Sequence, residues 1–467
     1  MSNIHQEEWR AIQGGIDERL DTAQESARVF STYTTERVQR IVQVMSKAGQ
    51  EKAAFYAEWS VRETGRGNVD DNVIKNISCS TGLLERYRPV DFIDPVIDYE
   101  KKIIAFPKPA GIIAALIPST NPVMTVYYNT MISMMTRNAI IFSPHPAASE
   151  CSIHAVDFLS EVAEEAGAPA GTIQTLRHLG IESLEYLMQS PRISVILATG
   201  GPNRVRAAYS SGNPAIGMGP GNVPCFVHES ADIGAAAEQI IASNSFDHAL
   251  PCVSESVVLA DRAIHARLRA AMAEANGYFV SGEEERKLRR YLFSNGEANP
   301  DAAGKSAVWL AKQAGFSVSE NIKTLIVEID GAGSDEPISK EKLFPVLGYM
   351  VIDGVQSAID AAQTMLNIIG KGHSAVIHSR DPAVVARYAQ ALPVCRISVN
   401  TRGVEGSSGM STNLTRGPVI GTGFFGGSSV DDNIGPQQLI QWSRAAYSVD
   451  ADISMEDMAK AIGGILA

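Results

Sequence analysis

The chain has 467 residues, which is more than one hydrophobic core usually holds, so we expect two or three domains. Its 52 acidic and 40 basic residues give a net charge of −12, and no long basic run is present. This charge balance argues against nucleic acid or an anionic membrane surface as a partner. The first ten residues, MSNIHQEEWR, lack the basic and apolar regions of a signal peptide, and no apolar stretch is long enough for a membrane span. We therefore expect a cytoplasmic protein.

The cysteines are widely spaced and form no CxxC pair. Five is an odd number, which does not suit a framework of paired disulfides. The spacing also differs from that of structural zinc sites, so we expect no metal centre. The five are Cys79, Cys151, Cys225, Cys252 and Cys395.

Residues 1–90 show the apolar spacing of amphipathic helices, for example at Val38, Ile41, Val42 and Met45. From about residue 110, short apolar strands alternate with helices, which predicts an α/β fold with a doubly wound, largely parallel sheet. In such a sheet ligands bind at the carboxyl ends of the strands. The expected strands are 111–117, 138–142 and 193–198, and the expected helices are 122–136, 149–166 and 202–210.

A stretch dense in glycine and proline, 212–224, interrupts this alternation and predicts a boundary between two α/β domains. The alternation then resumes. A further helix is expected near the end of the chain, where Ser454 followed by Asp457 resembles a capping box. The expected elements are strands 225–228 and 256–260 and helices 232–244, 262–276 and 454–463.

Cys252 is the first candidate for chemistry, in the segment SFDHALPCVSES (245–256). It follows a proline and precedes a small, polar turn before an apolar strand. This placement lets the thiol and a backbone N–H point at one spot, as a nucleophile with its own oxyanion donor requires. An isolated cysteine is more often a buried small hydrophobe, so its position alone leaves both readings open.

Several distant segments resemble, in one register, the coenzyme A-acylating branch of the aldehyde dehydrogenase family. The similarity is closest to the aldehyde dehydrogenase half of bifunctional aldehyde–alcohol dehydrogenases. The segments are 110–146, EEAGAPAG (164–171), GGPNRV (200–205), GMGPGNVP (217–224), FDHALPCVSES (246–256), AGFSVSEN (314–321), EKLFPVL (341–347), GKGH (370–373) and VNT (399–401).

The resemblance implies a Rossmann-like cofactor domain over residues 1–224, with an oligomerisation segment near 91–109. It also implies an α/β catalytic domain over 225–428 and a C-terminal return and oligomerisation segment over 429–467. A homodimer or a dimer of dimers is expected. As an alternative role, the helix at 454–466 would dock the enzyme to a shell protein inside a bacterial microcompartment.

The resemblance places Cys252 at the family nucleophile. The oxyanion would be held by the Cys252 backbone N–H and by a side chain of the loop PSTNP (118–122), with Asn121 preferred and Thr120 the other candidate. The alternative for Asn121 is that it caps the helix that follows.

The expected cofactor is NAD, because SPHP (143–146) stands where hydrolytic relatives carry a lysine on the adenosine ribose. NADP is less favoured, since no cation there meets a 2′-phosphate. Glu341 matches the glutamate that binds the nicotinamide ribose. The cofactor residues implied are Ser143, Pro144, His145, Thr199, Gly200, Gly201, Val205, Gly219 and Glu341.

Met218 and Gly219 stand where hydrolytic relatives carry the glutamate that activates water. Without that base, transfer of the acyl group from Cys252 to coenzyme A is the expected outcome. The expected reaction converts a small aldehyde, such as acetaldehyde or propanal, reversibly to its acyl-CoA. The alternatives are an anionic aldehyde, such as sulfoacetaldehyde or succinate semialdehyde, and a hydrolytic aldehyde dehydrogenase.

Two further residues are candidates for contact with coenzyme A or substrate. His373 in GKGH would touch one of them, or it would only satisfy a buried carbonyl. Arg402 and Arg416 lie in the late glycine-rich segment, where a guanidinium group would bind an anionic aldehyde. An exposed, solvated arginine is the competing reading, and Arg402 is the one we assign to the substrate.

Overall fold

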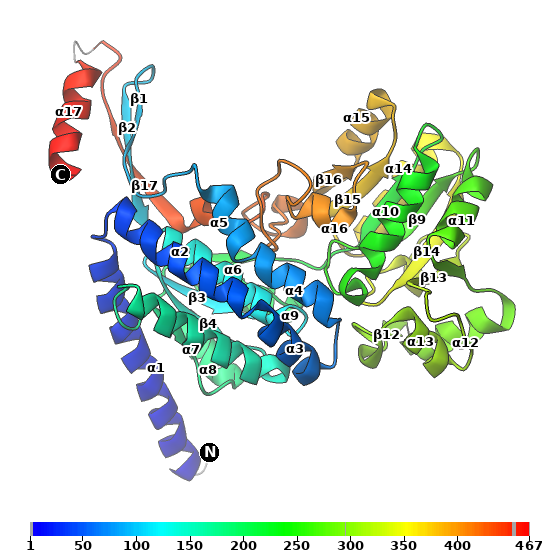
Figure 1. The fold of residues 1–467 in the computed structure, drawn as a ribbon, viewed down its shortest axis with the longest axis horizontal. Helices are drawn as coiled ribbons and strands as arrows, with labels where there is room; N and C mark the ends of the chain where they lie inside the picture. Colours follow the sequence, from blue (N-terminus) through cyan, green and yellow to red (C-terminus); the bar gives the residue numbers. More distant parts are fainter. Residues whose placement is uncertain (1–2, 295, 451–453, 467) are drawn as a thin grey trace.

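The computed structural model describes residues 3–294, 296–450 and 454–466. It has two α/β lobes side by side, each built on a parallel sheet, and an arm that extends from the first lobe (Figure 1). Both sheets contain parallel pairs throughout, as the alternation of strands and helices predicts. The expected α/β fold with largely parallel sheets is thereby confirmed.

The N-terminal helices cover the first lobe. In α2 (Thr35–Glu51), Val38, Ile41, Val42 and Met45 are all buried, so the helical spacing in the sequence is confirmed. The Thr34 side chain caps this helix by accepting from the Arg37 N–H. The other helices of this layer are α1 (Asn3–Phe30), α3 (Ala53–Thr64), α4 (Val69–Ser78) and α5 (Thr81–Tyr87).

The first sheet has five strands in the order β5-β4-β3-β6-β7. Its three predicted strands are confirmed, whereas β5 and β7 are short strands that the sequence pattern did not predict. β7 lies inside the stretch 212–224 that was expected to be a plain boundary. The strands are β3 (Ile112–Leu116), β4 (Ala139–Ser143), β5 (Ile173–Thr175), β6 (Val195–Ala198) and β7 (Ala215–Gly217), with helices α6 (Pro122–Met135), α7 (Ser149–Glu165), α8 (Ile181–Gln189) and α9 (Pro202–Tyr209).

The second sheet has seven strands in the order β10-β13-β14-β9-β8-β15-β16. The predicted strands at 225–228 and 256–260 are confirmed as β8 and β9. The strands are β8 (Val223–Val227), β9 (Glu255–Asp261), β10 (Gly277–Phe279), β13 (Thr324–Glu328), β14 (Val346–Ile352), β15 (Gly372–His378) and β16 (Val394–Val399). The larger helices of this lobe are α10 (Ile233–Ser245), α11 (His265–Glu274), α12 (Gly282–Leu292), α13 (Ala307–Ala314), α14 (Gly354–Ile368) and α15 (Pro382–Ala391), followed by the short α16 (Gly403–Ser407).

The two sheets meet through opposite edges. The loops after β3, β6 and β7 leave the carboxyl edge of the first sheet. The segments that precede β8, β9 and β15 lie at the amino edge of the second sheet, since these strands are neighbours and parallel. Residues from both edges line one cleft. The chain from about 404 then packs back on the first lobe, because Val404, Val419, Ile434 and Leu439 belong to its core.

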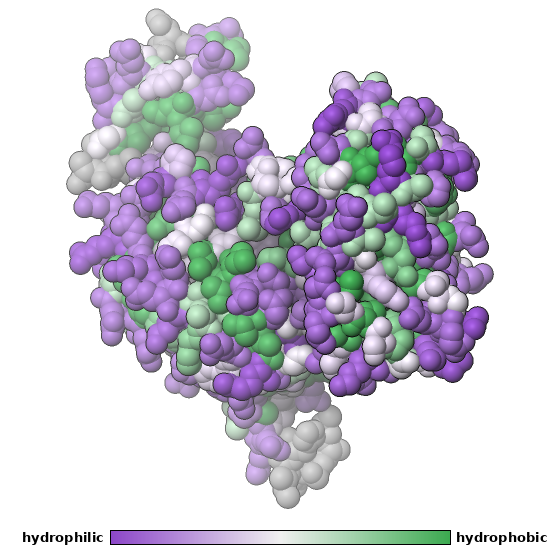
Figure 2. Space-filling view, turned by 45° about the vertical axis from the view of Figure 1, so that its right-hand side comes forward, coloured by the Kyte–Doolittle hydropathy of each residue, from purple (hydrophilic) through white to green (hydrophobic). Residues whose placement is uncertain are grey.

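The arm is an antiparallel sheet of β1 (Val96–Asp98), β2 (Ile103–Pro109) and β17 (Ile440–Ala446), with α17 (Met455–Leu466) beside it in Figure 1. Figure 2 shows hydrophobic residues gathered on this arm, and smaller hydrophobic patches among hydrophilic residues on the two lobes. The Asp457 N–H donates to the Ser454 hydroxyl, so the predicted cap of the last helix is confirmed. No helix within the described residues is long and apolar enough to cross a membrane.

Candidate active site

The loop that carries Cys252 has an unusual backbone. Asp247, His248 and Ala249 have φ angles of 47°, 55° and 60°, in the left-handed region that non-glycine residues rarely adopt. The loop leads through Pro251 and Cys252 into β9. Three such residues in succession are costly and persist only where the surroundings hold them, which is typical of functional sites.

The Asp247 carboxylate anchors this loop to helix α4. It accepts hydrogen bonds from the Asn68 N–H at 3.0 Å, from Asn72 Nδ2 at 2.8 Å and from Lys75 Nζ at 2.5 Å. The Asp247 N–H in turn donates to Asp71 Oδ2 at 2.7 Å. The side chains of Asp247 and Lys75 are 0% and 6% exposed, so this is a buried ion pair whose carboxylate is fully hydrogen-bonded. A buried charge needs such partners to be tolerated.

Lys75 also fixes Asn121, the preferred oxyanion residue. Lys75 Nζ donates to Asn121 Oδ1 at 2.8 Å, which leaves the amide Nδ2 as the free donor of that side chain. Its one contact is a long one, 3.4 Å to Thr120 Oγ1. Asn121 precedes α6, but its side chain makes no capping hydrogen bond. The capping alternative for Asn121 is therefore wrong.

The His373 ring contacts the Cys252 thiol. Its Nε2 is 3.2 Å from Cys252 Sγ, and its Nδ1 is 2.8 Å from the Ser374 hydroxyl. Burial lowers the pKa of His373 to about 3, with the Arg396 charge adding to the effect, so the imidazole is neutral. Burial, with the Glu341 carboxylate, raises the pKa of Cys252 to about 12. The sequence left open whether His373 meets the acyl group, coenzyme A or a buried carbonyl. The structure places its ring against the Cys252 thiol, to which an acyl group would be attached.

Gly221 is required at the back of this site. A Cβ there would lie 2.0 Å from the Cys252 carbonyl oxygen and 3.3 Å from the His373 ring, so no larger side chain fits. The Gly221 N–H donates to Glu341 Oε1 at 2.9 Å. The glycine thus lets the Cys252 loop, the His373 ring and the Glu341 carboxylate approach one another.

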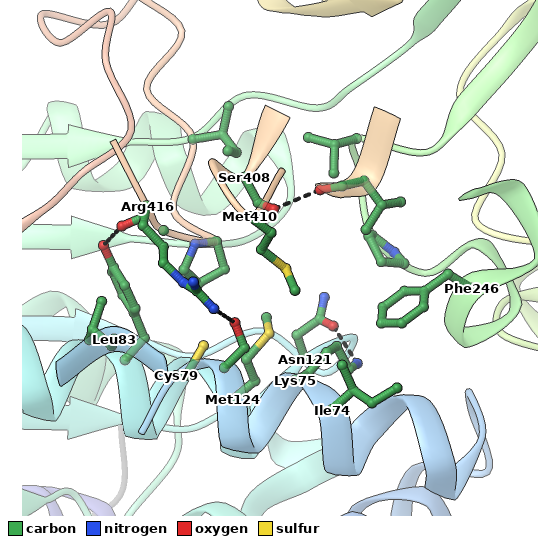
Figure 3. A pocket seen from close by; sticks show the side chains of 18 of the residues that line it. Ile74, Lys75, Cys79, Leu83, Asn121, Met124, Phe246, Ser408, Met410 and Arg416 are labelled. Carbon is green, nitrogen blue, oxygen red and sulfur yellow. Dashed lines mark hydrogen bonds between the residues drawn. The ribbon is translucent and has the colours of Figure 1, made fainter. Parts of the chain in front are cut away.

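A mainly apolar cavity of about 90 Å³ has Cys252 in its lining, and Figure 3 shows this cavity from close by. Asn121 and Lys75 form part of its wall, and Arg416 reaches it from the late glycine-rich segment. One water needs roughly 10–15 Å³ on the same measure. We call this cavity the acyl pocket. Its apolar wall includes Ile74, Leu83, Met124, Phe246, Val404, Met410 and Ile420.

A second, larger cavity of about 440 Å³ also has Cys252 in its lining, and we call it the cofactor cleft. Cys252 and Asn121 line both cavities, whereas Thr120 lines only the cleft. Six of the nine predicted cofactor residues line the cleft: His145, Thr199, Gly200, Gly201, Gly219 and Glu341. Ser143, Pro144 and Val205 are not among its lining residues.

The cleft suits a dinucleotide. The Thr199 hydroxyl is buried without a protein partner, and the N-terminus of α9 follows at Gly201, where backbone dipoles favour a phosphate. Two cations that the sequence analysis missed lie nearby, since Arg204 lines the cleft and Arg66 donates to the Ser119 hydroxyl at 3.1 Å. Burial lowers the pKa of His145 in this corner, with both arginines adding to the effect.

Arg402 does not line the acyl pocket. It forms an ion pair of 2.8 Å with Glu405, and its side chain is 47% exposed. It borders a neighbouring cavity of about 750 Å³, which shares Ile74, Phe246, Val404 and Met410 with the acyl pocket. Arg416 takes the place in the acyl pocket that we expected for Arg402. Across residues 3–294, 296–450 and 454–466, no group of three or more His, Cys, Asp or Glu side chains is placed to hold a metal ion.

A sequence model of the aldehyde dehydrogenase family matches residues 8–287. Aldehyde-alcohol dehydrogenase 2 of Entamoeba histolytica is 36% identical over 89% of this chain and 49% of its own length, so the chain spans about half the length of such curated relatives. The crystal structure of an acetylating aldehyde dehydrogenase from Geobacillus thermoglucosidasius is 35% identical, with a TM-score of 0.92 over 95% of this chain and 98% of that one. A propionaldehyde dehydrogenase from Rhodopseudomonas palustris, solved with bound CoA and an acylated cysteine, is 26% identical, with a TM-score of 0.84 over 92% of this chain and 97% of that one. The chain belongs to the aldehyde dehydrogenase family, on the acylating branch that these relatives represent.

Proposed function

We propose that this protein oxidises a short aldehyde to its acyl-CoA with NAD⁺, through a thioester on Cys252, and that it also runs the reverse reaction. The observation that carries the proposal is the position of Cys252. Its side chain lines both the acyl pocket and the cofactor cleft, beside Asn121 and 3.2 Å from a neutral His373. A nucleophile at such a junction can hold an acyl group on one side while redox chemistry proceeds on the other.

In the first step Cys252 Sγ attacks the aldehyde carbonyl carbon and His373 Nε2 accepts the thiol proton. A neutral imidazole can do this, whereas an imidazolium could not. The negative charge that forms on the carbonyl oxygen is stabilised by Asn121 Nδ2 and the Cys252 backbone N–H. Lys75 acts as a positioning residue, because its bond to Asn121 Oδ1 turns the amide N–H₂ away from itself.

The tetrahedral adduct then loses its former aldehyde hydrogen as hydride and becomes a thioester on Cys252. The nicotinamide ring, when bound, supplies the acceptor for that hydride. Thr199, Gly200 and Gly201 would hold the pyrophosphate of the cofactor, and Glu341 its nicotinamide ribose. The absence of a lysine at 143–146 is our ground for NAD over NADP. Comparison of NAD⁺ with NADP⁺ tests this choice, because Arg66 and Arg204 lie near His145 and are cations that a 2′-phosphate would meet. The coenzyme A thiol finally attacks the thioester carbon and frees Cys252.

Acyl transfer to coenzyme A is preferred over hydrolysis because no carboxylate stands at 218 or 219. Met218 is buried, and its sulfur accepts the Ile420 N–H, so it offers no base. Glu341 is the carboxylate in the cleft, but it is bound to the Gly221 N–H. Burial raises the pKa of Glu341 to about 7, so part of it is protonated at neutral pH. The Rhodopseudomonas palustris relative with an acylated cysteine and bound CoA supports the same outcome.

The size of the acyl pocket supports a substrate of the acetaldehyde or propanal type. A pocket of about 90 Å³ with a mainly apolar wall, where one water needs roughly 10–15 Å³, accommodates a short acyl chain. We also propose that two copies associate through the arm, where Val96 and Tyr99 are 52% and 55% exposed.

The test is NADH production from a panel of short aldehydes with NAD⁺, with and without coenzyme A, and with the products identified by mass spectrometry. We expect sustained turnover that needs coenzyme A and yields acyl-CoA. Sustained turnover to the free acid without coenzyme A would contradict the proposal and support the hydrolytic alternative.

A further inference from the structure

We propose that Arg416 forms an anion subsite in the acyl pocket, and that the preferred substrate is a short aldehyde with a terminal carboxylate or sulfonate. This inference rests on the proposed function and refines its substrate. Arg416, labelled in Figure 3, and Cys252 line the same cavity, so an acyl group on Cys252 would share this cavity with the guanidinium.

The charge of Arg416 is not neutralised by the protein. The pocket has two cationic side chains, Lys75 and Arg416. Lys75 is paired with the buried Asp247. Within the part of the chain that the structure describes, no carboxylate lies within ion-pair distance of the Arg416 guanidinium. The neighbouring Asp432 carboxylate accepts from the Thr415 hydroxyl. A mainly apolar pocket with one unpaired cation favours a ligand with one negative charge.

The guanidinium is held in place, yet most of its donors are free. Arg416 Nη2 donates to the Ser78 hydroxyl at 2.9 Å, and Nε is buried without a protein partner. The Arg416 carbonyl accepts from Tyr128 at 3.0 Å and from Tyr87 at 3.4 Å, which fixes the backbone. At Gly82 a Cβ would lie 2.9 Å from Nη2, so this glycine leaves room for the group. A guanidinium group whose N–H donors are already fixed in place binds a carboxylate or sulfonate at low entropic cost.

Helix α4 contacts both the proposed oxyanion site and Arg416. Lys75 contacts Asn121 at the proposed oxyanion site, and Ser78, three residues later, contacts Arg416. Residues three apart on a helix lie on the same side with Cβ atoms about 5–6 Å apart. The Asn121 amide and the Arg416 guanidinium are therefore contacted by side chains one helical turn apart on α4. A short aldehyde with a terminal anion, such as sulfoacetaldehyde or succinate semialdehyde, would place its carbonyl at the first group and its anion at the second.

The competing role for Arg416 is structural. Ser78 is the last residue of α4, and a cation near the carboxyl end of a helix stabilises the helix dipole. A structural arginine would affect stability and all substrates alike. A comparison of charged with neutral substrates therefore distinguishes a structural role of Arg416 from an anion-binding role.

The experiment measures kcat/KM for succinate semialdehyde against butanal and for sulfoacetaldehyde against propanal, with saturating NAD⁺ and coenzyme A. In the wild type we expect the anionic member of each pair to be preferred. Arg416→Met should lower the anionic-to-neutral ratio by about tenfold or more, because a lost charge-assisted pair typically costs that much. Arg416→Lys should keep part of the ratio, since it retains the charge but not the fork. Arg402→Met, outside the pocket, is the matched control and should leave the ratio unchanged.

An unchanged ratio in a folded Arg416→Met variant would overturn the subsite. If that variant does not fold, the wild type still provides the test through protection of Cys252 from iodoacetamide. Propane-1-sulfonate should then protect and neutral butanamide should not, whereas equal effects of the two would overturn the subsite. Loss of CoA-dependent turnover with every aldehyde would instead refute the proposed function. Turnover with propanal but no charge effect would refute only the subsite.

Discussion

Lys75 and Asp247 form a buried ion pair of 2.5 Å that joins the two sides of the proposed oxyanion site. Lys75 also holds the Asn121 amide, and Asp247 begins the left-handed stretch of the loop that carries Cys252. Lys75 thus orients the Asn121 amide, the proposed side-chain donor. Asp247 supports the loop that carries the Cys252 N–H, the proposed backbone donor. A displacement of either partner should disturb both donors.

Removal of one partner of this pair should be strongly destabilising. Lys75→Met leaves the Asp247 carboxylate buried without a counter-charge, which typically costs about 3–5 kcal/mol of unfolding free energy. The double variant Lys75→Met with Asp247→Asn removes both charges and should recover part of that loss. Urea unfolding of the wild type, both single variants and the double variant measures the coupling. Additive losses would show that the pair does not act as a unit.

Asn121→Ala should slow the first turnover far more than Thr120→Ala. Loss of one oxyanion donor typically lowers the rate by about 10²–10³-fold. Thr120 lines only the cofactor cleft, so its hydroxyl is not placed toward the acyl pocket. Stopped-flow NADH formation with saturating aldehyde gives both rates. A larger loss of the NADH formation rate in Thr120→Ala than in Asn121→Ala would show that Thr120, not Asn121, is the side-chain oxyanion donor.

Cys252→Ala should abolish turnover in both directions, whereas the other cysteines should be dispensable for the chemistry. Cys79 is the informative control because it lines the acyl pocket together with Cys252. Burial raises the pKa of the Cys79 thiol to about 12, and it has no histidine partner within the described residues. Cys79→Ala should therefore keep the acyl-enzyme step, as detected by intact mass. Retained turnover in a folded Cys252→Ala variant would refute the mechanism.

Without coenzyme A, the enzyme should release at most about one NADH per active site and then stop. The thioester accumulates because Met218 and Gly219 provide no base for water. Met218→Glu should raise hydrolysis only modestly, since position 218 is buried against the Ile420 N–H and a base must also reach the thioester. Rapid-quench measurement of the burst size and of free acid distinguishes the outcomes. Continued NADH release in the wild type would identify another base, with Glu341 the first to replace.

The sequence predicted the sheet architecture well because strands of a parallel sheet that are buried on both faces form apolar runs. β3, β4 and β6 lie within two residues of their predicted bounds. β7, with the three residues Ala215–Gly217, is too short for any periodic signal and lies among glycines and prolines. The proposed cofactor cleft lies at the carboxyl edge of the first sheet, where ligands are expected in such folds. Cys252 instead precedes β9, at the amino edge of the second sheet.

The contacts that orient the site could not be predicted, since they join residues far apart in the chain. Lys75 and Asp247 are 172 residues apart, and no local pattern relates them. Cys252 and His373 are 121 residues apart, so the resemblance placed each residue but not their contact. Arg402 and Arg416 follow the same strand and look equivalent in sequence. The fold alone decides that Arg416 lines the acyl pocket while Arg402 pairs with Glu405.

The pH dependence of Cys252 reactivity tests the role of His373. Burial raises the pKa of the thiol to about 12 and lowers that of His373 to about 3, so below pH 10 both groups are neutral. Iodoacetamide reacts with thiolate, and the thiolate fraction of a group with a raised pKa increases tenfold per pH unit throughout that range. The alkylation rate of the free enzyme should therefore rise steadily from pH 7 to 10. A plateau near neutral pH would mean that Cys252 and His373 already form a thiolate–imidazolium pair, and the neutral-base mechanism would be wrong.

His373→Ala should lower the rate of acyl-enzyme formation by about 10²-fold or more at pH 8, because proton transfer by a positioned base typically contributes about 10²–10⁴-fold. The loss should shrink as pH rises, since hydroxide then replaces the base. A histidine that only fills buried space would give a loss independent of pH. Ser374→Ala removes the hydroxyl 2.8 Å from His373 Nδ1 and should produce a smaller loss with the same pH trend. Stopped-flow NADH formation between pH 7 and 10 gives the rate of acyl-enzyme formation for wild type, His373→Ala and Ser374→Ala. Parallel profiles for wild type and His373→Ala would show that His373 takes no proton from Cys252.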